Sequence, residues 1–162
     1  KQPQVFVHRD FMPRNLMPAN DGPAVLDFQD AVRGPIAYDP LCLFKDAFVS
    51  WPQARIDAWL DRYHARAKDA GLPVPSLDQF RRDVDWIGVH RHLKVIGIFA
   101  RLHHRDGKSH YLEDAPRFFA YLDHVLPKYP ELAPLVDLIE RRVKPTLREY
   151  GHWTTVTGDT PA

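Results

Sequence analysis

Two short segments decide how this sequence is interpreted: His8-Arg9-Asp10-Phe11-Met12-Pro13-Arg14-Asn15-Leu16 and Val25-Leu26-Asp27-Phe28. Around them, the β-branched and aromatic run Val5 to Val7 and the apolar run Ala24 to Phe28 predict short strands. The turn signal Asn20-Asp21-Gly22 precedes the second run. The front of the chain is therefore expected to form a small β-hairpin.

The register of this hairpin determines which polar side chains meet. If the Asp21-Gly22 pair forms the centre of a two-residue turn, Leu16 lies opposite Asp27, and Asn15 ends beside Asp27. An amide oxygen and a carboxylate would then converge, which suits a Mg²⁺ ion that keeps some waters and takes phosphate oxygens. Asp10 lies a few residues away, where a carboxylate can accept a hydroxyl proton during phosphoryl transfer. The pattern predicts phosphotransferase chemistry.

At these residues the chain resembles the aminoglycoside phosphotransferase family of small-molecule kinases, which are relatives of the protein kinases. His8-x-Asp10-x4-Asn15 matches the catalytic loop of that family, and Asp27-Phe28-Gln29 stands where its metal-binding motif stands. The resemblance implies that Asp10 is the catalytic base, that Asn15 and Asp27 hold magnesium, and that His8 braces the loop. It also implies that Asp39 is the buried anchor that hydrogen-bonds the catalytic loop.

Other features narrow the resemblance. At position 9, where many aminoglycoside enzymes have glycine, this chain has arginine, the residue found in protein kinases. However, only 11 residues separate Asp27 from Asp39, without an Ala-Pro-Glu motif, which leaves no room for an activation segment and argues against a protein substrate. The segments 27–31, 34–35, 91–102 and 105–108 resemble the bacterial anomeric kinases of cell-wall recycling, which act on N-acetylmuramate and N-acetylglucosamine.

The anomeric-kinase resemblance covers about residues 5–150 and implies transfer of the ATP γ-phosphate to the anomeric hydroxyl of an amino sugar. The residues that contact this acceptor are not identified by the sequence. Arg9 and Asp30 are candidates for substrate binding, and Asp30 is equally consistent with capping a turn.

Helical periodicity dominates after Pro40. A helix carrying Ile56 to Ala67 is expected to stop near Gly71, and a capping box of Ser76 and Gln79 begins a long helix that extends to about His103. Two shorter helices are predicted to follow, punctuated by Pro127, Pro130 and Pro145; their apolar residues are Phe118, Phe119, Leu122, Val125 and Leu126, and then Leu132, Leu135, Val136, Ile139 and Val143. The expected fold class is α+β, mainly α. It corresponds to a protein-kinase-like C-terminal lobe whose small hairpin carries the catalytic and metal motifs.

Residues 1–150 are expected to form this C-terminal lobe, with its catalytic loop, metal site and substrate site, and residues 151–162 a mobile tail. Kinase chemistry also requires a glycine-rich loop and a strand lysine paired with a helix glutamate. Neither precedes Val5. The N-terminal lobe of the same protein is therefore expected as a missing partner, and the chain is expected to be a fragment that is inactive alone.

Composition excludes several other classes. With 162 residues, 44% of them hydrophobic, the chain is long enough to bury a core, and its net charge of +1 gives no reason to expect nucleic acid or a membrane surface as a partner. The longest purely apolar run, 95–100, is too short to span a bilayer. The single cysteine, Cys42, excludes an internal disulfide and is interpreted as a small core residue. A cytoplasmic location is expected.

Two alternatives stay open at this point. Within enzymes, the acceptor could be an aminoglycoside or another amino alcohol. In another class, the chain could be a noncatalytic binding module that keeps the metal motif as structure only, since any single carboxylate could be a helix cap or a surface charge.

Overall fold

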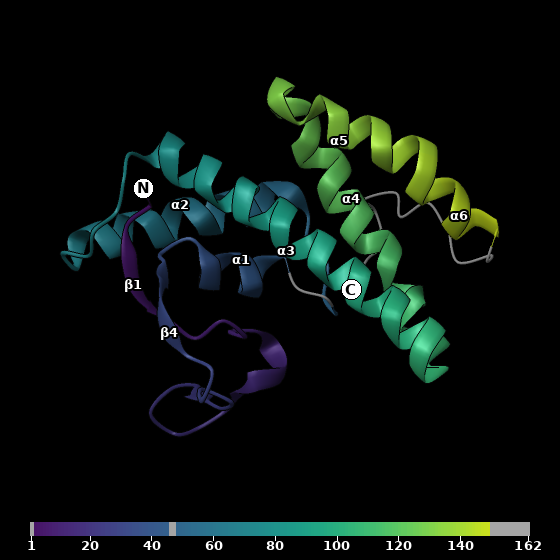
Figure 1. The fold of residues 1–162 in the computed structure, drawn as a ribbon. Coiled ribbons are helices and arrows are strands. Elements are labelled where there is room, and N and C mark those ends of the chain that lie inside the picture. The colour runs from purple at the N-terminus through teal and green to yellow at the C-terminus, as the bar shows by residue number, and fades with distance from the viewer. Residues whose placement is uncertain (1, 46–47, 150–162) are drawn as a thin grey trace. The chain divides into compact units, whose positions relative to one another are not determined.

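The computed structural model describes residues 2–45 and 48–149, which divide into two compact units (Figure 1). Unit 1 extends to Ile87, and unit 2 begins at Gly88. The 30-residue helix α3 (Leu77–Asp106) begins in unit 1, and its residues from Gly88 onward belong to unit 2. The fold is mainly helical with small antiparallel sheets, as the sequence predicts. The predicted tail, 151–162, lies outside the described residues.

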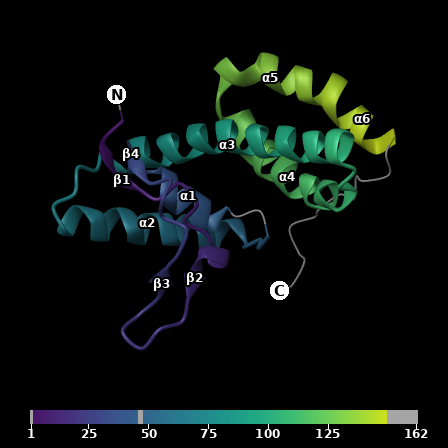
Figure 2. The same ribbon diagram turned by 60° about the horizontal axis from the view of Figure 1, so that its bottom comes forward.

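Unit 1 contains two antiparallel strand pairs (Figures 1 and 2). Strand β1 (Gln4–Val7) pairs with β4 (Val32–Pro35), and β2 (Leu16–Met17) pairs with β3 (Ala24–Val25). A single turn of 3₁₀ helix, η1 (Pro13–Asn15), leads directly into β2. The segment that carries the predicted catalytic motif thus runs from the end of β1 to the start of the β2–β3 hairpin.

Two predictions about these strands are wrong. The runs 5–7 and 24–28 do not pair with each other, and the hairpin register places Leu16 opposite Val25 instead of Asp27. The loop between β2 and β3 is longer than a two-residue turn, because it begins with Pro18 and ends with Pro23. A proline has no N–H to give to a strand ladder, and neither Pro18 nor Pro23 takes part in the β2–β3 pairing.

The helices of unit 1 are α1 (Tyr38–Phe44), α2 (Gln53–Asp69) and the beginning of α3. The predicted helix over 56–67 and the long helix after Ser76 are confirmed. Half of the predicted capping box forms: the Gln79 N–H donates to Ser76 Oγ at 3.3 Å, whereas the Gln79 side chain donates to Asp83 Oδ1 at 2.8 Å. One hydroxyl therefore satisfies an N–H at the start of α3 that has no partner within the helix.

The core of unit 1 lies between the sheet β1–β4 and the three helices. Its buried apolar side chains are Val7, Ile36, Ala37, Leu41, Cys42, Ile56, Leu60, Ala67, Phe80 and Val84. One buried ion pair joins the end of α1 to α3, because Lys45 Nζ lies 3.5 Å from Asp85 Oδ1 with side chains 2% and 12% exposed. Burying both charges is tolerated because each has the other as a partner.

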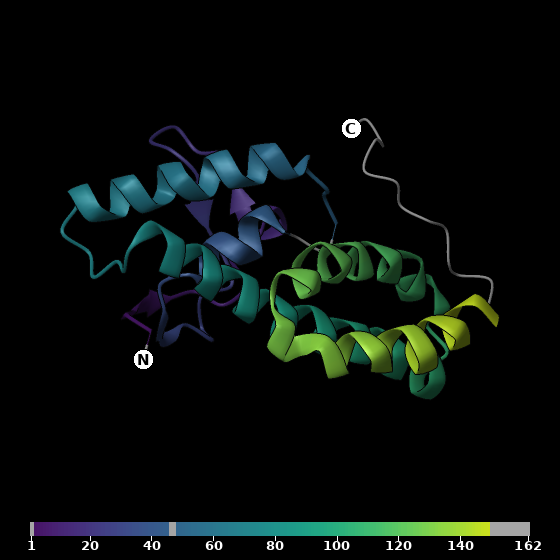
Figure 3. The same cartoon turned by 90° about the horizontal axis from the view of Figure 1, so that it is seen from above.

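Unit 2 consists of helical segments, with α4 running beside the rod formed by α5 and α6 (Figures 1 and 3). Its elements after α3 are η2 (Ser109–Asp114), α4 (Ala115–Val125), η3 (Leu126–Lys128), η4 (Pro130–Leu132), α5 (Ala133–Leu138), the π-helical turn η5 (Ile139–Val143) and α6 (Lys144–Glu149). Within the described ranges, no helix combines the length and apolar character needed to cross a bilayer.

The two predicted short helices form in unit 2, but the second is interrupted by the π turn and does not end at Pro145. The N–H of Lys144 bonds to the carbonyl of Ile139, five residues back. Pro145 is the second residue of α6, where a missing N–H costs little. Pro145, one of the prolines that punctuate the predicted helices, therefore lies in the first turn of α6.

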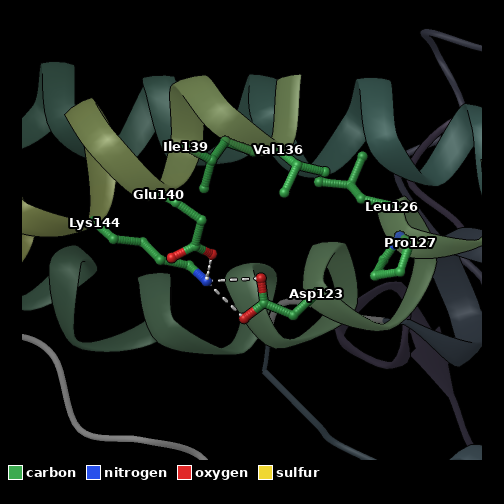
Figure 4. A pocket seen from close by; sticks show the side chains of 7 residues that line it. All are labelled: Asp123, Leu126, Pro127, Val136, Ile139, Glu140 and Lys144. Carbon is green, nitrogen blue, oxygen red and sulfur yellow. Dashed lines mark hydrogen bonds and ion pairs between the residues drawn. The ribbon is translucent and has the colours of Figure 1, made fainter. Parts of the chain in front are cut away.

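A buried lysine links the last part of unit 2 to α4 (Figure 4). Lys144 Nζ donates to both carboxylate oxygens of Asp123, at 2.8 and 2.9 Å, and to Glu140 Oε1. The lysine side chain is 8% exposed and borders a cavity of about 300 Å³ whose walls include Leu126 and Val136. Burial lowers the pKa of Lys144, but the hydrogen bonds with the two carboxylates outweigh burial and raise this pKa above its ordinary value.

This arrangement predicts a pH-dependent contribution to stability. The folded-state pKa of Lys144 is raised above the unfolded value of 10.5, so the contribution is complete below pH 10.5 and is lost as pH rises through the folded-state pKa. Lys144→Met should lower the free energy of unfolding at neutral pH, measured by urea denaturation, and the difference from the wild type should shrink well above pH 10.5. As a control, Lys94→Met at an exposed position should leave the free energy of unfolding nearly unchanged at both pH values. A Lys144 effect that does not change with pH would contradict this account.

Candidate functional site

The segment His8–Asn15 is held by a carboxylate on α1. Asp39 lies in the first turn of that helix, and its two oxygens accept the backbone N–H groups of His8 at 2.7 Å and Arg9 at 3.0 Å. Arg9 has a backbone φ of 77°, in the left-handed region that is unfavourable for a residue with a side chain. The charge-assisted bonds to Asp39 help to hold the backbone in this conformation immediately before Asp10. The predicted contact of Asp39 with the catalytic loop is therefore present in the structure.

Asp39 is half-buried, so the prediction of a buried anchor holds only in part. Tyr63, on α2, stacks against Phe80 with ring centroids 5.8 Å apart. Burial raises the pKa of Tyr63, and the negative charge of Asp39 raises it further, so the phenol stays neutral at physiological pH. A hydrogen bond to a carboxylate is stronger in such surroundings than in water.

His8 connects the segment that carries the predicted catalytic motif to the segment around Asp27. The histidine is 4% exposed, and its Nε2 lies 2.8 Å from the carbonyl oxygen of Leu26, which can only accept, so Nε2 carries the hydrogen. A second connection is made by the Leu26 N–H, which donates to the carbonyl oxygen of Asn15 at 2.9 Å. Leu26 is thus fixed at both its N–H and its carbonyl, directly before Asp27. The backbone of Asp27 is itself left-handed, with a φ of 63°.

The predicted metal ligands, Asn15 and Asp27, lie on these two connected segments. The amide nitrogen of Asn15 donates to the carbonyl oxygen of Asp10 at 2.9 Å, which leaves the amide oxygen as an acceptor. Asp27 Oδ1 accepts a hydrogen bond from Gln29 Nε2 at 2.8 Å, and Oδ2 takes no part in that contact. Asp27 is exposed, whereas Asp10 and Asn15 are half-buried.

This donor set fits magnesium. Mg²⁺ prefers oxygen ligands and is commonly held by one or two protein groups together with waters and phosphate oxygens. Over residues 2–45 and 48–149, no group of three or more His, Cys, Asp or Glu side chains is arranged to hold a metal ion.

The two candidate acceptor contacts, Arg9 and Asp30, also come together. Arg9 Nη1 lies 3.4 Å from the backbone carbonyl oxygen of Asp30, which is a long hydrogen bond between exposed groups. Together with the His8–Leu26 and Leu26–Asn15 hydrogen bonds, this contact is the third between residues 8–15 and residues 26–30. Whether either residue binds a substrate stays a prediction.

One residue of this site was assigned only a packing role from the sequence. Cys42 is buried, as predicted, but its thiol also donates to the carbonyl oxygen of Arg9, with Sγ 3.2 Å from that oxygen. The signal that could have identified it is its spacing, because positions 39 and 42 are three apart on a helix and lie on the same face.

Residues 1–77 match a family model described as a phosphotransferase enzyme family. Three curated relatives are named N-acetylmuramate/N-acetylglucosamine kinase. The chain is 62% identical to the one from Pseudomonas putida over 139 residues, which are 85% of this chain and 41% of the relative. It is 59% identical to the one from Pseudomonas aeruginosa over 140 residues (86% and 41%), and 53% identical to the one from Neisseria meningitidis over 139 residues (85% and 42%).

The chain therefore spans about two-fifths of the length of the curated relatives that it matches. These matches confirm the resemblance that the motifs predict. They cover residues on both sides of the boundary between unit 1 and unit 2, since 139 aligned residues exceed the length of either unit.

The Asp39 contacts lead to a stability prediction. Asp39→Asn keeps one acceptor oxygen but turns an amide N–H group toward one of the two backbone donors, so we expect the free energy of unfolding to fall by about 2 kcal/mol. Asp30→Asn, at an exposed position of the same unit, should change it by less than about 0.5 kcal/mol. Urea denaturation followed by circular dichroism measures both. Equal effects of the two substitutions would show that Asp39 does not hold the loop.

Proposed function

Residues 1–77 match the model of a phosphotransferase enzyme family, and on this basis we propose that the chain is the catalytic part of an ATP-dependent small-molecule kinase. The acceptor that we propose is the anomeric hydroxyl of N-acetylmuramate or N-acetylglucosamine, with a role in cell-wall recycling in the cytoplasm. The observation that carries the proposal is the connection of Asp10, Asn15 and Asp27 through Leu26 and Asp39. Three groups suited to phosphoryl transfer are thereby held on two adjoining loops.

In this mechanism Asp10 orients the acceptor hydroxyl and takes its proton. The hydroxyl oxygen forms a bond to the γ-phosphorus of ATP, the bond from that phosphorus to the β–γ bridging oxygen breaks, and ADP leaves with the electron pair. Asp10 is half-buried and its carbonyl oxygen accepts the Asn15 side chain, which suits a group that must be both positioned and reached by a small hydroxyl compound. The products are a sugar 1-phosphate and ADP.

Asn15 and Asp27 are the residues that we propose to hold magnesium. The ion would neutralise negative charge on the nucleotide phosphates when bound. The chain supplies the fixed positions of these ligands: the Asn15 side chain is held by the Asp10 carbonyl, and Asp27 follows the doubly bonded Leu26. His8 contributes by holding Leu26 and acts on the reaction only through that contact.

We further propose that residues 1–150 form the C-terminal lobe of a kinase-like fold, and that another segment of a longer protein holds the nucleotide phosphates. The coverage of about 41% of the relatives supports this. Exposed apolar side chains on unit 1 support it as well: Phe6 is 74% exposed, Phe28 67% and Met17 52%. Apolar groups of this size are commonly covered by another part of the same protein or by a partner.

The proposed acceptor is tested with the longer protein that contains this chain. Phosphate transfer from ATP is followed with N-acetylmuramate, N-acetylglucosamine, kanamycin and choline in parallel, and the product is examined by ³¹P NMR. We expect an anomeric phosphate on one or both amino sugars. Transfer to kanamycin or choline alone would support an amino-alcohol kinase instead. Absence of both transfer and magnesium-dependent nucleotide binding would support a noncatalytic binding module.

The role of Asp10 is tested in the same protein. Asp10→Asn removes the group that accepts the proton but keeps its size, so kcat should fall by at least about 10²-fold. Asp21→Asn, in the β2–β3 loop, is the matched control and should leave kcat nearly unchanged. A fully active Asp10→Asn protein would remove the assigned role.

The 162-residue chain alone should show little phosphotransfer. In kinase-type enzymes, a glycine-rich loop and a lysine outside the catalytic segment bind the nucleotide phosphates. We expect ATP turnover with N-acetylmuramate to be at least about 10²-fold slower for the chain than for the longer protein, in a coupled ADP assay. Comparable turnover by the two proteins would show that the described residues contain a complete site.

A further inference from the structure

The Arg9 residue is held at both ends by side chains of α1. Its N–H donates to Asp39 at 3.0 Å, and its carbonyl oxygen accepts the Cys42 thiol, with the Sγ–O distance 3.2 Å. Cys42 is 1% exposed, so the thiol meets this carbonyl in a part of the site that is largely closed to water. Two side chains on one face of α1 therefore hydrogen-bond both the N–H and the carbonyl oxygen of Arg9.

The residue that these two hydrogen bonds hold has an unfavourable backbone conformation. The left-handed φ of 77° at Arg9 costs energy because its Cβ approaches backbone atoms, and such conformations persist where the surrounding contacts over-determine them. The bond to Asp39 fixes the N–H but leaves rotation about the other side of the residue. The thiol adds the second restraint, at the carbonyl that forms the peptide bond with Asp10.

We propose that Cys42 is a positioning residue for Asp10, an inference that rests on the function proposed above for that carboxylate. The thiol fixes the plane of the Arg9–Asp10 peptide, and this plane determines the direction in which the Asp10 backbone continues. The Asp10 carbonyl oxygen in turn accepts the Asn15 side chain at 2.9 Å. The contact made by Cys42 therefore influences both the proposed base and a proposed metal ligand.

The chemistry required at position 42 is that of a small donor. A thiol is a weak hydrogen-bond donor, so its value lies in direction more than in strength. Serine is similar in shape and donates more strongly, whereas alanine and valine cannot donate. The proposal therefore predicts that function follows the presence of a donor at position 42 and is independent of the sulfur atom itself.

The first experiment compares Cys42→Ala with Cys42→Ser in the longer protein. Alanine should lower kcat roughly 3- to 10-fold, as expected for one lost hydrogen bond, and serine should restore kcat to within about twofold of the wild type. Equal losses in both variants, in proportion to their melting temperatures, would overturn the proposal. If the alanine protein does not fold, Cys42→Val replaces it as the variant without a donor.

The second experiment tests the link to the Arg9 backbone. Glycine adopts a left-handed backbone without the steric cost, so Arg9→Gly should make the thiol less necessary. In the Arg9→Gly background, Cys42→Ala should change kcat by less than about twofold, relative to Arg9→Gly alone. The same 3- to 10-fold loss in both backgrounds would show that Cys42 acts by another route.

A third measurement does not depend on activity. The backbone ¹³C shifts of Arg9 in the 162-residue chain distinguish a left-handed from an extended conformation. They should change in Cys42→Ala and remain close to the wild type in Cys42→Ser. Unchanged shifts in the alanine variant would overturn the proposal. If the wild-type longer protein phosphorylates no sugar, the proposed function fails, and these shifts still decide whether the thiol holds Arg9.

Discussion

The carboxylate of Asp39 is the constraint on which the candidate site depends. Two consecutive backbone N–H groups, those of His8 and Arg9, must point toward one side chain for both bonds to form. The chain has a left-handed backbone at Arg9, and the carbonyl oxygen of this residue meets the Cys42 thiol on α1. Because the carboxylate sits in the first turn of a helix, the helix dipole also favours its charge. A helix from the core of unit 1 thus holds the start of the loop that leads from β1 to η1.

The rest of the site follows from this turn through backbone contacts. His8 can donate to the carbonyl of Leu26 because its own backbone is fixed, and Leu26 is fixed again by the carbonyl of Asn15. The side chains with proposed chemical roles therefore lie at the ends of short, hydrogen-bonded paths and are not packed into the core. Such an arrangement keeps the polar groups accessible to a substrate and still defines their positions.

Sequence reasoning succeeded where a local pattern determines structure. The helical spacing of Ile56 to Ala67 and the cap at Ser76 depend on residues close together in the chain, and both helices form. The strand pairing failed because it depends on the path of the intervening segment: Pro18 and Pro23 lengthen the loop, and β1 takes β4 as its partner. The family resemblance identified Asp39 as the residue that holds the loop. The sequence pattern predicted only a core position for Cys42, because it does not show which carbonyl group the thiol contacts.

We propose that Asn15 and Asp27, held by this set of contacts, bind a single cation. A titration of the ¹⁵N-labelled chain with Mn²⁺, followed by paramagnetic broadening of amide signals, tests this proposal. We expect the signals of residues 15–16 and 26–28 to broaden together at the same Mn²⁺ concentration, before those around Asp123 and Glu140. Broadening of only one of the two segments, or of all exposed carboxylates alike, would contradict it.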